Sequence, residues 1–448
     1  MRTTVGGRSR ECAGTRRLDE AMKDGVLREE AQERVREIGH ADIVVGIPSY
    51  NNAGTIGHVV ETVRMGLARY YPLAKSVIVN ADGASTDGTP DLAAPAAAGG
   101  TADAPGRPGI RAISTPYQGI PGKGSAVRTI LELACDVGAS ACAVVDADLR
   151  SITPEWVGLL IGPVTDSGFD YVAPLYRRHK YDGTITNSVI YPLTRALYGK
   201  CVRQPIGGDF GFSGRLARFY LSKRDVWESS VARFGIDVWV TTTAIAEGFR
   251  VCQSFLGSKI HDFKDPGVHL ATMLYQVVGA AFDLMETYAG VWKRACRSES
   301  VQTFGVVRET PIEPVAVNVP GMMERFRLGA QELADLWETI LGREIVSFLK
   351  KLASLGEKDF FLPDDLWTEI IYRSAVSAHR KVINKEHLLK SLATLYIGRT
   401  ASFVIETRRD DAAAVEEKIE RLCLAFEEKK PFLVKSWEQD KEVSPCTT

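Results

Sequence analysis

The chain has 448 residues, of which 45% are hydrophobic and 25% are charged, and its formal net charge is −1. These values are ordinary for a globular protein of two or three domains. A net charge so close to zero gives no overall field that favours nucleic acid or an anionic membrane as a partner. The eight cysteines are scattered without a CxxC pair, which argues against a zinc knuckle or a disulfide scaffold and favours a reducing compartment.

We expect the N-terminal part of the chain to be a basic tail, with a targeting role as the alternative. Residues 1–17 are rich in Arg and Gly but lack the apolar stretch of a signal peptide, and residues 18–38 have the pattern of an amphipathic helix. No apolar run is expected to reach the roughly 18–20 residues that span a membrane, because the best candidate, residues 275–292, carries two acidic residues. We therefore expect a tail and helix over residues 1–40, no membrane span and a cytoplasmic location.

From residue 41 onward, short apolar runs alternate with helical patterns. The expected strands are residues 42–47 (closed by Pro48), 76–80, 111–114, 141–145 and 171–174, the expected helices are 55–70 and 124–137, and the Ala/Gly/Pro-rich stretch 93–109 is an expected loop. This alternation predicts an α/β fold with a mostly parallel, doubly wound sheet over residues 41–265. In such sheets ligands bind at the carboxyl ends of the strands.

Beyond residue 265 the alternation stops. Residues 266–448 contain long charged and apolar stripes, such as 322–352 and 366–392, that are typical of helices. We expect a helical C-terminal domain that packs on the first domain, covers its ligand site and mediates self-association as a homodimer.

The strongest chemical signal is the Asp146-Ala-Asp148 motif after the fourth predicted strand. Two carboxylates at a strand end suit a hard divalent cation such as Mg²⁺ or Mn²⁺, and such a cation can hold the diphosphate of a nucleotide-sugar. An exposed turn is the plain alternative. His261 follows another apolar run and is a candidate further metal ligand, although a lone histidine is more often structural.

Polar motifs also follow the first two predicted strands. Pro48, Tyr50 and Asn51 follow the first strand, and the turn that contains Asp82 and Ser85 follows the second. These side chains can contact the base and ribose of a nucleotide, or simply close a turn before the next helix. Between glycines and before a helix lies Lys123, which can reach a phosphate or a base.

Three further segments combine glycine, carboxylate or basic residues. The basic run that contains Arg178 precedes Asp182 and Thr186 and can hold an anionic group, or form a solvated face. Gly207 and Gly208 precede Asp209, and a Gly-Ile pair precedes Asp237; both are either turns or close approaches of the backbone to a ligand.

In this order, the motifs of residues 41–265 resemble the family-two-like glycosyltransferases of the GT-A fold. The Arg178, Gly207-Gly208 and Asp237 segments, the late His261 and the helical C-terminal part extend the resemblance to the mannosylglycerate synthases and the related glucosylglycerate and glucosyl-3-phosphoglycerate synthases. One departure is Asn51-Asn52, where the family-two pattern has Asn-Glu.

The resemblance implies a retaining transfer of a hexose, with glucose favoured over mannose, from a GDP-, ADP- or UDP-sugar. The acceptor would be the 2-hydroxyl of D-glycerate, a phosphorylated form of it or a related small hydroxy acid, and the product a compatible solute such as glucosylglycerate or mannosylglycerate, or its precursor. The implied roles are as follows: metal, Asp148, His261 and Asp146; donor, Pro48, Tyr50, Asn51, Asp82, Ser85, Lys123 and Asp146; acceptor, Arg178, Asp182, Thr186, Gly207 and Gly208; reaction centre, Asp237 and Asp209.

Three alternatives remain. A polyprenol-phosphate sugar transferase at a membrane surface shares the motifs of the first domain, but the acceptor-like Arg178 segment opposes it. A sugar-1-phosphate nucleotidyltransferase would carry a Gly-rich loop where this chain has Pro48-Ser-Tyr-Asn51. An inactive nucleotide-sugar-binding or assembly protein would have no need of an intact Asp146, Asp148 and His261.

Overall fold

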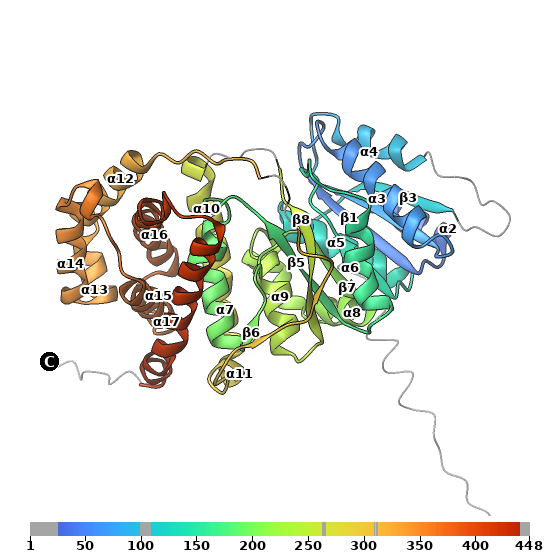
Figure 1. The fold of residues 1–448 in the computed structure, drawn as a ribbon. Helices are drawn as coiled ribbons and strands as arrows, with labels where there is room; N and C mark the ends of the chain where they lie inside the picture. The colour runs from blue at the N-terminus through green and yellow to red at the C-terminus, as the bar shows by residue number, and fades with distance from the viewer. Residues whose placement is uncertain (1–25, 99–108, 262–265, 309, 311, 440–448) are drawn as a thin grey trace, which may run out of the picture.

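The computed structural model describes residues 26–98, 109–261, 266–308, 310 and 312–439. Two regions lie side by side: a sheet flanked by helices and a bundle built from the second half of the chain (Figure 1). The helix expected at residues 18–38 is present as α2, Glu29–Ile38, and the tail at residues 1–25 lies outside the described residues.

The main sheet has eight strands in the order β10-β8-β5-β7-β4-β1-β2-β3. Only β7 runs antiparallel to its neighbours, β4 and β5, and the other pairs are parallel, so the prediction of a mostly parallel sheet is confirmed. The strands are β1 Ile43–Ser49, β2 Ser76–Asp82, β3 Ile110–Pro116, β4 Ala141–Val144, β5 Tyr171–Arg177, β7 Phe210–Ser213, β8 Val251–Ser258 and β10 Thr303–Phe304, and a separate pair is formed by β6 Lys200–Cys201 and β9 Glu299–Ser300.

Helices cover both faces of the sheet because successive strand residues point to opposite sides. Ile43, Val45 and Ile47 of β1 belong to the core shared with α3 and α6, whereas Val44 belongs to the core shared with α5, α8 and α9. The helices of the first face are α3 Ile56–Tyr70, α4 Thr89–Ala98 and α6 Glu155–Thr165, and those of the second are α5 Lys123–Asp136, α8 Gly214–Ser222 and α9 Ile236–Ala246.

Two local predictions need correction. Residues 93–98, expected in a loop, continue helix α4; their alanines favour a helix, and residues 99–108 lie outside the described part. Strand β1 also continues through Pro48 to Ser49. Its register pairs Pro48 with Ala81 and Ser49 with Asp82, so the two functional loops begin side by side.

The bundle comprises α10 Pro266–Thr287, α11 Ala289–Trp292, α12 Val319–Glu332, α13 Ala334–Leu341, α14 Arg343–Ser354, α15 Asp364–His379, α16 Lys385–Thr407 and α17 Ala412–Glu438. Between it and the sheet lie the π-helix η2, Thr186–Ile190, and α7, Tyr191–Tyr198; the short helices η3 Arg224–Glu228, η4 Ser230–Ala232 and η5 Glu357–Asp359 complete the described set.

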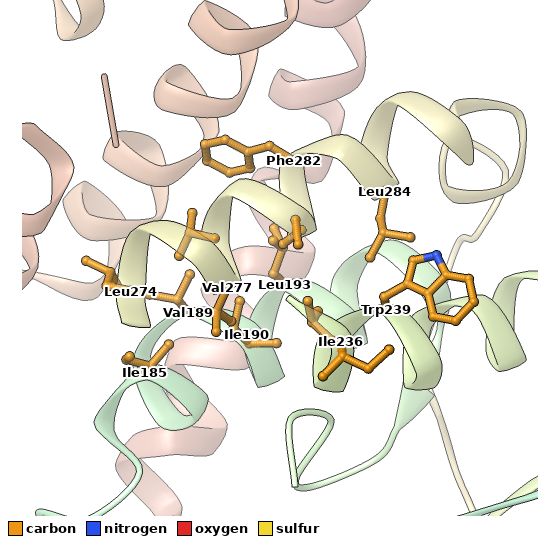
Figure 2. Packing of buried hydrophobic residues seen from close by; sticks show 14 of the residues in the cluster. Ile185, Val189, Ile190, Leu193, Ile236, Trp239, Leu274, Val277, Phe282 and Leu284 are labelled. Carbon is orange, nitrogen blue, oxygen red and sulfur yellow. The ribbon is translucent and has the colours of Figure 1, made fainter. Parts of the chain in front are cut away.

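The sheet region and the bundle share one continuous core. Leu193 of α7, Ile236 of α9, and Val277 and Leu284 of α10 lie in the same apolar cluster (Figure 2). Strand β10, which follows α10 in sequence, extends the edge of the main sheet beside β8. Residues beyond 265 therefore both pack on the sheet region and complete it.

Helix α16 is long and apolar enough to cross a membrane by length and composition, and sequence analysis overlooked it. Its most apolar 18-residue window is 72% buried inside the protein. The helix packs against α10, α12 and α15, and burial on several sides gives a helix this composition without any membrane.

Candidate functional site

Five charged side chains meet at the carboxyl ends of the central strands. Lys123 begins α5, Asp146 follows β4, Asp209 precedes β7, Asp237 lies in the first turn of α9 and Lys259 follows β8. We call these residues the carboxylate–lysine cluster. Sequence reasoning named the first four and missed Lys259.

Two lysines hold the cluster together. The Nζ atom of Lys123 is 2.8 Å from Oδ1 of Asp146 and 3.1 Å from Oδ1 of Asp237. The Nζ atom of Lys259 is 2.6 Å from Oδ2 of Asp146 and 2.7 Å from Oδ2 of Asp209. Both oxygens of Asp146 are thus bound by ammonium groups, and Asp146 is the hub of the network.

Asp209 lies behind this hub and is fully buried. Its Oδ1 accepts a hydrogen bond of 2.7 Å from the backbone N–H of Asp146, and its Oδ2 also accepts one from the hydroxyl of Tyr176. A carboxylate with these partners fixes the strand end and the lysine, and it faces no open space. Sequence analysis placed Asp209 at the reaction centre; the geometry favours a positioning role.

The pKa values of two carboxyl groups in the cluster, those of Asp146 and Asp237, are shifted in opposite directions. Burial raises the pKa of Asp237 to about 6, against the partial compensation of Lys123. Burial also acts against the ionised form of Asp146, but Lys123 and Lys259 outweigh it and hold the pKa of that carboxyl well below its usual range. Burial likewise opposes the charge on both lysines, yet the neighbouring carboxylates raise the pKa of each. The cluster therefore holds two largely buried ammonium groups in place through three largely buried carboxylates.

The glycines before Asp209 have a structural reason. A Cβ atom on Gly208 would lie 2.1 Å from Oδ2 of Asp146, and one on Gly207 would lie 2.1 Å from Cγ of Pro174. These glycines allow the chain to pass close to the cluster and to β5. A contact with an acceptor stays a prediction for both.

The loops after β1 and β2 are tied together by side chains. Asp82 is almost fully buried, and its carboxylate accepts hydrogen bonds from the backbone N–H and hydroxyl of Ser85 at 2.8 and 2.6 Å. The hydroxyl of Ser85 accepts in turn from the backbone N–H of Asn51 at 2.8 Å. Tyr50, next to it, has 65% of its surface exposed. The predicted donor residues therefore form one surface with an exposed aromatic ring, in which Asp82 braces the loops.

The predicted metal ligands Asp148 and His261 come from two adjoining segments. Leu149 and His261 form an isolated antiparallel bridge, and the backbone N–H of Arg150 donates to the carbonyl of Ile260 at 2.9 Å. The segment after β8 is thereby aligned with the one that carries Asp148.

Within the described residues, no group of three or more His, Cys, Asp or Glu side chains could by itself hold a metal. The backbone contacts bring the segments of Asp148 and His261 together, and Nε2 of His261 lies 4.0 Å from Oδ2 of Asp182, so a metal contact stays a prediction for both Asp148 and His261. Asp146 differs, because lysines already occupy both of its oxygens, so this geometry lends no support to the direct metal contact that was predicted for it.

A small hollow, partly open to solvent, adjoins the cluster. We call it the Arg178 pocket. Its walls come from the segment after β5, the segment after β6 and the first turns of α17: Tyr176, Arg178, His179, Lys180, Asp182, Gly183, Thr186, Asn187, Arg203, Gln204, Val415, Glu416 and Ile419. Three of the five predicted acceptor residues, Arg178, Asp182 and Thr186, are thus brought together.

The basic segment is not a solvated turn. Lys180 donates to the carbonyls of Thr407 and Asp410 at 2.7 and 2.9 Å and so binds the end of α16. The guanidinium of Arg178 lies over the ring of Tyr176, 5.0 Å from its centroid, and its nearest carboxylate, Asp182, is 3.6 Å away. Its buried Nε has no hydrogen-bond partner.

Tyr176 joins the pocket to the cluster, and sequence reasoning missed it. Its hydroxyl donates to Asp209, its ring lies beneath Arg178, and the Nζ of Lys259 is 5.1 Å from the ring centroid. The position of Tyr176 at a strand end was a usable signal, as was that of Lys259 two residues before His261. Glu416, in a distant helix, gave no such signal.

Comparisons with known proteins agree with this arrangement in part. Residues 44–224 match the model of the family described as Glycosyl transferase family 2. No curated protein sequence is significantly similar to the chain.

Among solved structures, the chain resembles glucosyl-3-phosphoglycerate synthase from Mycobacterium tuberculosis in complexes with Mg²⁺ and UDP (21% identity, 56% of this chain and 83% of that one, TM-score 0.41). It also resembles the same enzyme with Mn²⁺, UDP-glucose and phosphoglyceric acid (21%, 58% and 84%, 0.42). At these TM-scores the likeness carries no argument about substrates. The segment that matches the family covers strands β2 to β5 and β7 of the main sheet and carries the Asp-x-Asp motif at the carboxyl end of β4. Residues 44–224 are therefore similar to a glycosyl transferase family 2 domain, and they lie in the mostly parallel, helix-flanked sheet that the sequence predicts.

Proposed function

We propose that the protein transfers a hexosyl group from a nucleoside-diphosphate sugar to the 2-hydroxyl of a small hydroxy acid such as D-glycerate, with retention of configuration. One observation carries this proposal: the Arg178 pocket and the carboxylate–lysine cluster share Tyr176. A planar guanidinium suits a carboxylate. An acid held by Arg178 would therefore lie beside the cluster, within reach of a sugar bound there.

The donor would lie across the loops after β1 and β2. The exposed ring of Tyr50 can stack on a base, while Asn51 and Ser85 hold the loop that surrounds it. Lys123 would contact the donor as predicted, but its ammonium group is already paired with Asp146 and Asp237, so most of the diphosphate charge would be compensated by a bound cation. The choice among GDP, ADP and UDP, and between glucose and mannose, depends on one or two hydrogen bonds; glucose remains the favoured sugar.

A divalent cation, Mg²⁺ or Mn²⁺, belongs to this proposal, with Asp148 and His261 as its protein ligands. When bound it would neutralise charge on the departing diphosphate. Asp146 is then assigned a different task from the predicted one, because its salt bridges hold Lys123 and Lys259 in place.

Retention follows most simply from attack on the face that the diphosphate leaves. The acceptor oxygen forms a bond to the anomeric carbon, the bond from that carbon to the phosphate oxygen breaks with its electron pair going to the diphosphate, and the acceptor proton passes to the diphosphate. In this scheme Asp237 and Asp209 orient the two lysines, and neither acts as a nucleophile. The product would be a compatible solute or its precursor; a cytoplasmic location and a homodimer stay predictions.

A donor-by-acceptor screen tests the proposal: GDP-, ADP- and UDP-glucose and GDP-mannose against D-glycerate, 3-phosphoglycerate, D-lactate and polyprenol phosphate. We expect transfer to a hydroxy acid, lost on chelation with EDTA and in Asp148→Ala, and severely reduced in His261→Ala, because the diphosphate charge is then uncompensated. Asp335→Ala, an exposed carboxylate in the bundle, is the matched control. Full activity after chelation would refute the metal, and transfer to polyprenol phosphate alone would favour the membrane-surface alternative.

A further inference from the structure

We propose that Glu416, at the start of α17, restricts the Arg178 pocket to acceptors with a single negative charge, so that an unphosphorylated hydroxy acid binds and its phosphorylated form is rejected. The proposal rests on the proposed function, since it concerns the acceptor of that transfer. It assigns a specificity-determining role to a helix far outside the segment that matches the glycosyltransferase family.

Arg203 is already paired with Glu416. Its Nε and NH2 atoms bind Oε2 and Oε1 of Glu416 at 3.1 and 2.8 Å, which is a bidentate pair. Such a pair uses the Nε–NH2 edge of the guanidinium, through which an arginine could otherwise hold a phosphate. Arg203 lines the pocket, but its fork is already occupied from within the protein.

The other basic groups of the pocket are Arg178, His179 and Lys180, and they differ in how free they are to bind an anion. Lys180 is bound to backbone carbonyls at the end of α16. Burial and the nearby Lys180 lower the pKa of His179, so this ring is neutral at pH 7. Arg178 remains, with a buried Nε that lacks a hydrogen-bond partner and a carboxylate no closer than 3.6 Å. Among the described residues of the lining, one guanidinium is therefore left to receive an anion.

Neighbouring side chains pack against Arg203 and against the helix that carries Glu416. Arg203 lies over the ring of Tyr191, 5.1 Å from the centroid. Val415 and Ile419, on either side of Glu416 along α17, pack into a small core with the same tyrosine. The carboxylate of Glu416 is thus held against Arg203 by its own helix, and a ligand has to compete with an arrangement that packing maintains.

The pairing of Arg203 with Glu416 determines how much negative charge on an acceptor the pocket tolerates. A phosphate group adds about −1.5 to −2 at pH 7. In this pocket it would meet a cation that is already paired and a carboxylate that repels it. A carboxylate alone needs only Arg178.

The test compares D-glycerate with 3-phospho-D-glycerate in the wild type, Glu416→Gln and the double variant Arg203→Gln/Glu416→Gln, by steady-state kinetics and by calorimetric binding. We expect Glu416→Gln to raise the ratio of phosphoglycerate to glycerate efficiency by roughly 10- to 100-fold, because a freed arginine gains a charge-assisted contact. The double variant should lose this gain. Glu417→Gln is the matched control, since Glu417 is the exposed neighbour on the same helix.

The outcomes separate the two proposals. A wild type that binds and uses neither acid refutes the proposed function together with this inference. A wild type that uses glycerate, with a ratio unchanged in Glu416→Gln relative to Glu417→Gln, refutes the inference alone. A wild type that already prefers phosphoglycerate also overturns the inference while it leaves the transfer to a hydroxy acid intact.

Discussion

The two sides of the candidate site hold their charges differently. On the donor side, two lysines and three carboxylates are paired within 3.1 Å of one another, and all five come from the sheet region. On the acceptor side, the nearest carboxylate to Arg178 is that of Asp182 at 3.6 Å, beyond hydrogen-bond distance, and part of the wall comes from α17. The donor side is therefore built within the sheet region, whereas the acceptor side also depends on a helix of the bundle.

The largest expected effect comes from removing that second region. A chain that ends at residue 265 lacks α10 to α17 and β10, so Leu193, Ile236 and Trp239 lose the apolar surface on which they pack. We expect an insoluble or inactive product, because such a patch promotes aggregation. Solubility, size-exclusion chromatography and transferase assays measure this; a monomeric fragment with full activity would contradict it.

The next effect comes from breaking the donor side. Lys259→Met leaves Asp146 and the fully buried Asp209 without their shared cation. Loss of one partner of a buried ion pair costs about 3–5 kcal/mol, and we expect transfer to fall at least 100-fold. Denaturant unfolding and kinetics give the two values. Lys223→Met, which removes a partly exposed pair with Glu247, should cost less than about 1 kcal/mol; equal losses in the two variants would refute the distinction.

The acceptor side should respond to Arg178 in one parameter. Arg178→Ala, and also Arg178→Lys, should raise the acceptor KM by roughly 10- to 100-fold, which corresponds to about 1.5–3 kcal/mol, because an ammonium cannot form the planar bidentate contact. The donor KM should hardly change. Asp182→Ala and Thr186→Ala should shift the same parameter. Kinetics with D-glycerate varied at saturating donor decide the matter, and an unchanged acceptor KM and kcat in both Arg178 variants would remove the reason to name a hydroxy acid.

The smallest expected effect is a pH dependence on the donor side. The pKa of Asp237 rises from 3.8 to about 6 on folding, so its favourable contribution is full below pH 3.8 and is lost as the pH rises through about 6. Asp237→Asn should therefore match the wild type near pH 4 and exceed it at pH 7 by on the order of 2 kcal/mol. Thermal unfolding at the two pH values measures this, with the exposed Asp225→Asn as control. A variant less stable than the wild type at pH 7 would show that the charge is favourable.

Much of the fold could be predicted from local pattern, because the apolar runs before Pro48, Asp82 and Asp146 are typical of strands in a sheet that is buried on both faces. The candidate site could be predicted to the extent that its residues stand at the ends of predicted strands. Tyr176 and Lys259 also stand at strand ends, but they were missed because neither belongs to a motif that indicates a ligand site.

Contacts between residues far apart in the sequence could not be predicted from the local sequence pattern. Lys180 meets carbonyls more than two hundred residues away, and nothing in its own segment distinguishes that contact from solvent exposure. The composition of α16 was likewise ambiguous, since a helix buried in a bundle and one in a lipid bilayer satisfy the same hydrophobic demand.

The bond from Lys180 to the end of α16 has a thermodynamic consequence. It ties the segment that carries Arg178 to the turn between α16 and α17. Linkage between two such elements is reciprocal. If fraying of that turn weakens acceptor binding, a bound acceptor stabilises the turn against fraying by the same free energy. Amide hydrogen exchange at residues 407–416 would then report how fully the acceptor site is occupied.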